Sequence, residues 1–126
     1  MRRRVTLAVL SLLVAAILIG SFVPIETKMW LGTTGRHAHR ILHLASFGVT
    51  ALLLISLART LRGRIAMALA VCALAFFVEA GEKYAFGGSM EWHDVRDDSL
   101  GVAAALLISA LRRVLAGSSN RAASGK

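Results

Sequence analysis

Long apolar runs separated by short charged segments dominate the chain. Residues 5–23 carry no charge, and further apolar runs cover residues 41–58, 65–78 and 99–111, with only His43 interrupting the second. About 20 apolar residues in a helix cross the ~30 Å hydrocarbon core of a bilayer, so such runs predict membrane-spanning helices. We therefore predict an all-α integral membrane bundle of four transmembrane helices, at about residues 5–23, 41–58, 65–82 and 96–115.

The composition excludes the main alternatives to a membrane protein. Of the 126 residues, 56% are hydrophobic and 17% are charged, and the mean hydropathy is +0.66. Soluble domains are about 45–50% apolar and about 25% charged, so too few polar groups remain here to cover a water-soluble globule. The same apolar excess excludes a disordered chain. Cys72 is the only cysteine, which excludes a disulfide scaffold.

The basic residues are distributed unequally between the predicted loops. With a cytoplasmic N-terminus, ten of the fifteen Lys and Arg residues lie on the inner side, namely Arg2, Arg3, Arg4, Arg59, Arg62, Arg64, Arg112, Arg113, Arg121 and Lys126. Cytoplasmic loops carry such an excess, so we predict a multi-pass protein of the inner (cytoplasmic) membrane with both termini inside. Residues 1–116 form the bundle, and residues 117–126 are expected to be a flexible cytoplasmic tail.

The charge pattern also bears on partners. The net charge is +8 and the pI is near 11.3, but the basic residues are spread over helix ends, where they meet anionic lipid headgroups. We therefore expect the lipid bilayer and no nucleic acid as a partner. All seven acids and all four histidines fall on the predicted outer side.

The third and fourth apolar runs are too short to cross a bilayer without acidic residues. Counting about 20 residues outward from Ile65 reaches Tyr84, and the same count from Leu111 reaches Trp92. The counted segments contain five acids: Glu79, Glu82, Asp94, Asp97 and Asp98. Carboxylates at that depth are costly unless they are paired, hydrated or bound to a ligand.

The spacing of the ionisable residues places each set on one side of its helix. Residues three or four apart are neighbours on a helix surface. This spacing holds for three sets: His39 with His43, Glu79 with Glu82, and Asp94 with Asp97 and Asp98. We predict that three helices bring these sets together at the outer membrane face, in a polar cluster of His39, Arg40, His43, Glu79, Glu82, Asp94 and Asp98. The outer-side residues expected to be solvated are Asp97, Glu91 and His93.

The fourth predicted helix also carries a face of small residues. Gly101, Ala105 and Ser109 recur at every fourth position behind the aspartates. Such a face lets another helix approach closely, so we expect these residues to serve helix packing.

The polar cluster admits several interpretations. Two histidines and carboxylates can bind a divalent metal, although the His-x3-His spacing is a weak signal, and the candidate ligands are His39, His43, Glu79 and Asp94. The same groups can act as acid and base in a membrane-embedded enzyme, or as a relay in a proton-coupled carrier. A structural interpretation also stays open, with the histidines as an interfacial pair and the aspartates as helix caps.

Three short segments resemble, in order and spacing, the motifs of a known family. Residues 39–47 (HRILHLASF), 79–82 (EAGE) and 91–101 (EWHDVRDDSLG) resemble the D-K-x-x-H-x-x-x-[YF], E-x-x-Q and D-x-x-x-N-x-x-G segments of VanZ-like membrane proteins. The resemblance covers about residues 37–105. The matching positions are Arg40 (as a basic residue), His43, Glu79, Asp94 and Gly101. The departures are His39, Glu82 and Asp98, where aspartate, glutamine and asparagine are usual, and the missing outer-loop arginine near Gly88.

The resemblance implies a small polytopic protein of the cell envelope. The founding member of the family is associated with reduced sensitivity to teicoplanin, a glycopeptide that acts on the outer face of the membrane, and no reaction is established for the family. We therefore expect a protein that acts through its polar cluster on a surface ligand, a lipid-linked precursor or a partner membrane protein. Without the outer-loop arginine, Arg40 or Arg96 is expected to balance the acidic charge.

Overall fold

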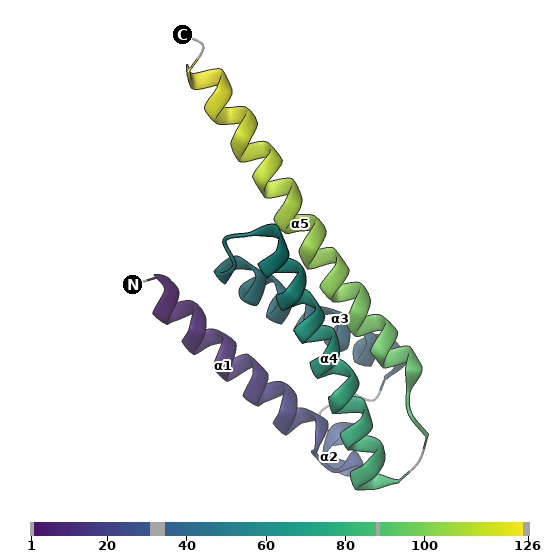
Figure 1. Ribbon diagram of the computed structural model, residues 1–126. Helices are drawn as coiled ribbons and strands as arrows, with labels where there is room; N and C mark the ends of the chain where they lie inside the picture. Colours follow the sequence, from purple (N-terminus) through teal and green to yellow (C-terminus); the bar gives the residue numbers. More distant parts are fainter. Residues whose placement is uncertain (1, 31–34, 88, 125–126) are drawn as a thin grey trace.

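The computed structural model describes residues 2–30, 35–87 and 89–124, and these residues form helices with no strand among them (Figure 1). The helices are α1 (Arg2–Ser21), α2 (Ile25–Trp30), α3 (Arg36–Leu57), α4 (Leu61–Phe86) and α5 (Trp92–Ser124). Within the described part of the chain, four helices are long and apolar enough to cross a membrane, over Arg3–Ser21, His37–Leu57, Leu61–Phe86 and Trp92–Ala116. The predicted all-α class with four long apolar helices is confirmed.

The helices extend further into the polar segments than the predicted boundaries. Helix α3 begins five residues before position 41, and α4 continues four residues past position 82, so the ionisable residues lie within helical turns. Helix α5 runs from Trp92 to Ser124, through most of the segment predicted as a tail. The flexibility of that segment stays a prediction, and residues 125–126 and Gly88 lie outside the described residues.

Pro24 determines where the first helix ends and where the short second helix begins. The residue before a proline disfavours the α conformation, and α1 ends at Ser21, slightly before the predicted end at position 23. The backbone N–H groups of Thr27 and Lys28 both donate to the Pro24 carbonyl, which starts α2 at once. Sequence reasoning did not anticipate this extra helix.

Helices α3, α4 and α5 form the packed part of the bundle. Their buried apolar residues recur at helical spacing and make one core: Phe47, Ala51, Ile55, Ala68, Val71, Ala75, Val78, Val102 and Ala105. Helices α3 and α5 are in close backbone contact at Gly101, where an added Cβ would collide with the Leu44 carbonyl oxygen and lie 3.0 Å from the Gly48 backbone nitrogen. The predicted small-residue face of α5 therefore meets a glycine on α3.

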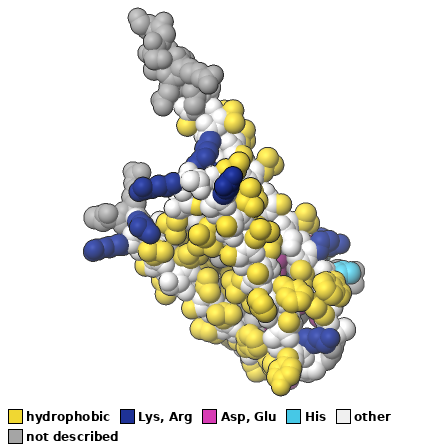
Figure 2. Space-filling view, viewed as in Figure 1, with side chains coloured by type: hydrophobic (Ala, Val, Ile, Leu, Met, Phe, Trp, Pro, Cys, Tyr) yellow, Lys and Arg dark blue, Asp and Glu magenta, His cyan; other side chains and the backbone are white. Residues whose placement is uncertain are grey.

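Helix α1 lies apart from this packed group. Only 6% of its apolar window is buried, against 17–22% for the other three long helices. Large apolar side chains also face outward elsewhere, with Leu12 72%, Leu69 63% and Leu107 70% exposed. On the face in Figure 2, hydrophobic side chains cover most of the bundle. An apolar exterior of this extent suits contact with lipid.

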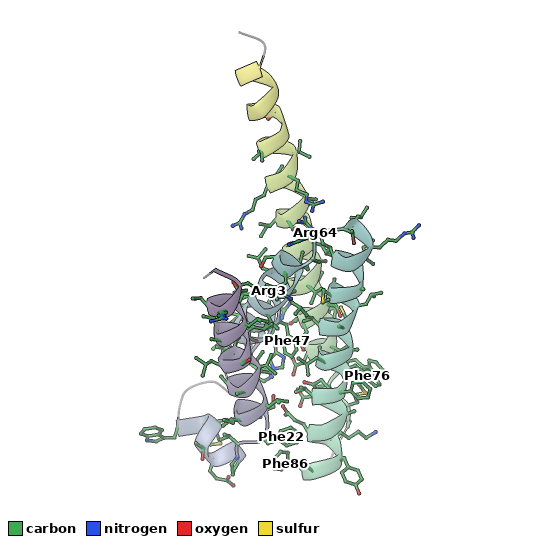
Figure 3. The ribbon with its side chains drawn as sticks, turned by 60° about the vertical axis from the view of Figure 1, so that its left-hand side comes forward. Arg3, Phe22, Phe47, Arg64, Phe76 and Phe86 are labelled. Carbon is green, nitrogen blue, oxygen red and sulfur yellow. The ribbon has the colours of Figure 1, made fainter. Side chains whose placement is uncertain are left out.

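The bundle has two ends of different character. The start of α1 and the turn between α3 and α4 lie toward one end, which we call the basic end, and α5 continues past this end (Figure 1). The described arginines of the basic end are Arg3, Arg4, Arg59, Arg62, Arg64, Arg112 and Arg113. Helix α2 and the connection between α4 and α5 lie at the other, which we call the acidic end. Figure 3 shows Arg3 and Arg64 toward the basic end and Phe22 and Phe86 toward the acidic end.

Candidate functional site

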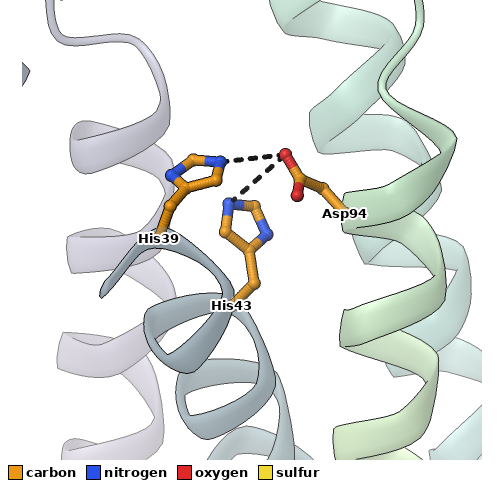
Figure 4. A group of neighbouring side chains, drawn as sticks. All are labelled: His39, His43 and Asp94. Carbon is orange, nitrogen blue, oxygen red and sulfur yellow. Dashed lines mark hydrogen bonds and ion pairs between the residues drawn. The ribbon is translucent and has the colours of Figure 1, made fainter. Parts of the chain in front are cut away.

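Two histidines of α3 meet two aspartates of α5 at the acidic end. The His39 Nε2 atom lies 2.9 Å from the Asp94 Oδ2 atom, and the His43 Nδ1 atom lies 3.0 Å from the Asp98 Oδ1 atom. The His43 Nε2 atom is 4.0 Å from the same Asp94 oxygen (Figure 4). The i, i+4 spacing on each helix aligns the pairs, because it stacks side chains on one face.

Asp97 corrects one expectation from the sequence. It was expected to be solvated, but it is only 1% exposed. The Arg40 Nε–H donates to its carboxylate over 2.6 Å, and the Arg96 Nη2–H donates over 3.0 Å. The cause is the tight packing of α3 on α5: Asp97 precedes Gly101 by four residues, so it lies on the face that Gly101 turns toward α3.

Glu79 is buried on α4, four residues after the core residue Ala75. It is 4% exposed and makes no hydrogen bond or ion pair with the described residues. It lies within electrostatic range of Asp94 and His43. Glu82, one turn further, is set apart: its carboxylate pairs with Lys28 of α2 at 3.4 Å. The structure thus brings six of the seven predicted cluster residues to one region and places Glu82 beside it.

The buried carboxylates outnumber the cations that contact them. Four acids of this region are at most 5% exposed: Glu79, Asp94, Asp97 and Asp98. Arg40 and Arg96 both contact Asp97, whereas among the described residues Asp94 and Asp98 pair only with the two imidazoles and Glu79 has no ion pair. The Asp98 Oδ2 atom is buried without a hydrogen-bond partner among the described residues. Buried carboxylates without a cationic partner are costly in a membrane protein, so this arrangement makes the cluster a candidate functional site.

The loop residues beside the cluster are more exposed. Glu91 and His93 are exposed, as expected from the sequence. Partial burial and then the neighbouring Asp94 raise the pKa of the Glu91 carboxyl above its usual range. The Glu91 carboxyl, in the segment before α5, thus interacts directly with Asp94 of the cluster.

A groove between α1 and α3 leads to the cluster. Its volume is about 280 Å³, near the lower end of the ~300–1,000 Å³ typical of small-molecule pockets. Apolar residues line its inner part, including Leu13, Ile17 and Phe47. The polar residues at its other end are Lys28, His39, His43 and Glu82. The groove therefore has an apolar part and a polar part, and two histidines of the cluster line the polar part.

A second, more polar cavity of about 780 Å³ also has His39 in its lining. Its lining includes Arg40, Glu91, Asp94 and Arg96, from α3, the segment before α5 and the start of α5. Because His39 lines both this cavity and the groove, the cluster is accessible from two directions.

Two further contacts were missed by the sequence reasoning. Gly48 packs against Gly101. A single glycine within an apolar run does not by itself predict a helix contact, so the sequence did not indicate this one. At the basic end, the Arg64 Nη1–H donates to the Ser109 hydroxyl over 2.8 Å, so Ser109 binds a side chain rather than only allowing close packing. Ala105 is buried in the core, as a packing residue should be.

The chain was compared with protein-family models, with curated proteins and with solved structures, and no match was found.

Proposed function

We propose that this chain is a VanZ-like membrane protein of the cell envelope that binds the polar head of an amphiphilic ligand, such as a lipid-linked precursor, at its histidine–carboxylate cluster. The observation that carries the proposal is that His39 and His43, which pair with Asp94 and Asp98, line the polar part of a mainly apolar groove. A lipid-linked molecule has an apolar chain and a polar head, which match the apolar and polar parts of the groove.

The contacts support this ligand class over a soluble one. The inner groove offers apolar side chains such as Leu13 and Phe47, which suit a hydrocarbon chain. Its polar part offers imidazoles and the ion pair of Lys28 with Glu82, which suit a polar or charged head. A fully water-soluble ligand would leave the apolar part of the groove unused.

The proposed orientation puts the acidic end on the outer face of the cytoplasmic membrane. The arginines of the basic end support it, because Lys and Arg accumulate on the cytoplasmic side. A site on the outer face is where glycopeptides such as teicoplanin act, so the proposal extends to an effect on sensitivity to such antibiotics. That extension rests on the resemblance of the three motifs to those of VanZ-like proteins.

Single alanine replacements of His43, Glu79 and Asp94 test the proposal in cells whose sensitivity to envelope-active antibiotics changes on deletion of the gene. Protein level in the membrane is held constant and measured in each strain. We expect each variant to behave like the deletion, whereas His93→Ala, which alters an exposed histidine of the same region, behaves like the wild type. Wild-type sensitivity in all three variants would contradict the proposal.

A membrane-embedded acid–base enzyme is the second candidate. The His43 Nδ1 contact with Asp98 favours it, because a carboxylate that orients an imidazole leaves the second ring nitrogen available for proton transfer. Purified protein would then convert a lipid-linked substrate, and His43→Ala would abolish turnover. Stoichiometric binding of such a substrate without any conversion would support the binding function instead.

A further inference from the structure

We propose that His39, His43 and Asp94 bind one divalent transition-metal ion, with Asp98 as the residue that orients His43. The proposal does not rest on the function proposed above, because it concerns the ion alone. Three observations carry it: the convergence of the ligand atoms, the hydrogen bond behind His43, and the charge of the buried cluster.

The ligand atoms converge on one point. Each of the three side chains offers one ligand atom, and these atoms all lie within 4.8 Å of one another (Figure 4). Around a tetrahedral ion with bonds of ~2.0–2.2 Å, ligand atoms are about 3.3 Å apart. The His39–Asp94 distance of 2.9 Å is already shorter than this, and the His43–Asp94 distance of 4.0 Å requires only a small side-chain movement.

Asp98 holds His43 in the form that a metal requires. An ionised Asp98 carboxylate can only accept, so across the 3.0 Å contact it would favour the His43 tautomer that carries its proton on Nδ1. The lone pair is then on the Nε2 atom, which is the nitrogen closer to Asp94. A metal-binding histidine commonly donates its other N–H to a carboxylate in this way. Asp98 is itself 1% exposed, so this orienting contact is shielded from water.

A divalent cation would offset the buried acidic charge. Arg40 and Arg96 contact Asp97, so among the described side chains Asp94 and Asp98 pair with imidazoles alone and Glu79 has no ion pair. Neutral imidazoles, which are the form that ligates metals, do not offset this charge. One ion of charge +2 at Asp94 would reduce the excess of three negative charges to one.

The ligand types define the class of ion. Two imidazoles and one carboxylate suit Zn²⁺ and similar transition metals, whereas Mg²⁺ and Ca²⁺ prefer oxygen ligands. Three protein ligands leave a fourth position open for water or for a ligand. His39 lines both the groove and the polar cavity, so an ion can enter from the polar side.

Metal binding to the purified full chain tests the proposal. The protein carries a purification tag without histidine, is loaded with ZnCl2 in detergent, and is dialysed before elemental analysis and titration against a chromophoric chelator. We expect one equivalent of zinc per chain. His43→Ala and Asp94→Ala should lose stoichiometric binding, and Asp98→Asn should weaken it by about 10–100-fold, since removal of an orienting partner has effects of this size.

The matched controls are His37→Ala and His93→Ala, because both residues are exposed histidines of the same end and lie outside the ligand set. They should bind zinc like the wild type. Less than 0.2 equivalents in the wild type, or equal losses in the controls, would overturn the proposal.

Co²⁺ provides a readout that does not depend on any variant folding. We expect intense visible absorption bands, typical of a four-coordinate site, when the wild-type protein is titrated with CoCl2. A titration that leaves only the weak spectrum of aqueous Co²⁺ would overturn the proposal. Zinc binding together with unchanged antibiotic sensitivity in the His43 variant would leave the metal site standing and contradict only the proposed function.

Discussion

At the basic end of the bundle, arginines reach outward or bind backbone carbonyls, whereas at the acidic end short side chains are buried between helices. Arg64 donates to the Ala58 carbonyl and to Ser109, and Arg113 donates to the Arg59 carbonyl. Asp97 and Asp98, in contrast, are each 1% exposed and are held by side chains from the facing helix. Charged residues near helix termini are therefore exposed or bound to backbone at the basic end, and buried against partner side chains at the acidic end.

Side-chain length explains this difference. An arginine extends far enough to keep its charge in the interfacial region while its Cα lies deeper. An aspartate cannot, so once its helix face turns inward it requires a partner close to the backbone. Charge at the basic end therefore bonds to the turns and stays near the surface, while charge at the acidic end is held by partners from the facing helix.

The largest effect is expected from cysteine labelling, which tests whether the two ends lie on opposite sides of the membrane. In a Cys72→Ala background, which leaves no other cysteine, Glu91→Cys and Arg62→Cys mark the acidic and basic ends. We expect a membrane-impermeant maleimide to label Glu91→Cys in intact spheroplasts, and to label Arg62→Cys only after permeabilisation, because arginine-rich loops stay cytoplasmic. The reverse pattern would place the cluster on the inner face.

A second effect concerns the helix contact that assembles the acidic end. Gly101→Ala introduces a Cβ against the Leu44 carbonyl oxygen, and backbone atoms cannot rotate away. We expect a loss of about 2–3 kcal/mol in the free energy of unfolding, in the upper part of the range for overpacking. Thermal unfolding in detergent measures it. Gly20→Ala is the control, because its Cβ meets nothing within 4 Å and the change should be neutral or slightly stabilising. Equal stability of the two variants would contradict the close approach of α3 and α5.

Asp97→Ala is expected to have an intermediate effect. It removes the shared partner of Arg40 and Arg96, which are 50% and 55% exposed and can turn toward water. We therefore expect a loss of about 1–2 kcal/mol in unfolding free energy, less than the ~3–5 kcal/mol for breaking a fully buried pair. Denaturation in mixed detergent micelles gives the value. A loss as large as that of Gly101→Ala would mean that both arginines are held more tightly than their exposure indicates.

The smallest effect is expected at the basic end. Ser109→Ala removes the hydroxyl that accepts from Arg64, and a typical hydrogen bond contributes about 0.5–1.5 kcal/mol; we expect the lower half of that range because Arg64 keeps its bond to the Ala58 carbonyl. The same unfolding assay compares Ser109→Ala with Ser118→Ala, whose hydroxyl donates only to the Leu115 carbonyl one turn away. If Ser109→Ala costs more than Asp97→Ala, the contrast between a tethered basic end and a partnered acidic end is wrong.

Much of the architecture is readable along the chain because the patterns involved are local. The apolar runs predict four long helices, and the shortfall of the third and fourth runs predicts that Glu79 and Asp94 lie within helices, as the structure has them. The i, i+4 spacing also predicts that His39 and His43 share a face. These features do not depend on how one helix is rotated against another.

The choice of partners depends on that rotation and on relative depth, which no local pattern encodes. Asp97 was expected in water because it is one of three aspartates on a stripe, and only the position of α3 decides which aspartate meets Arg40 and which meets His43. The pairing of Glu82 with Lys28 depends on α2, a helix that follows from one proline and was not anticipated. The long apolar helices and the acids within them thus follow from composition and period, whereas the pairs that make the cluster arise from the approach of α3 to α5 at Gly101.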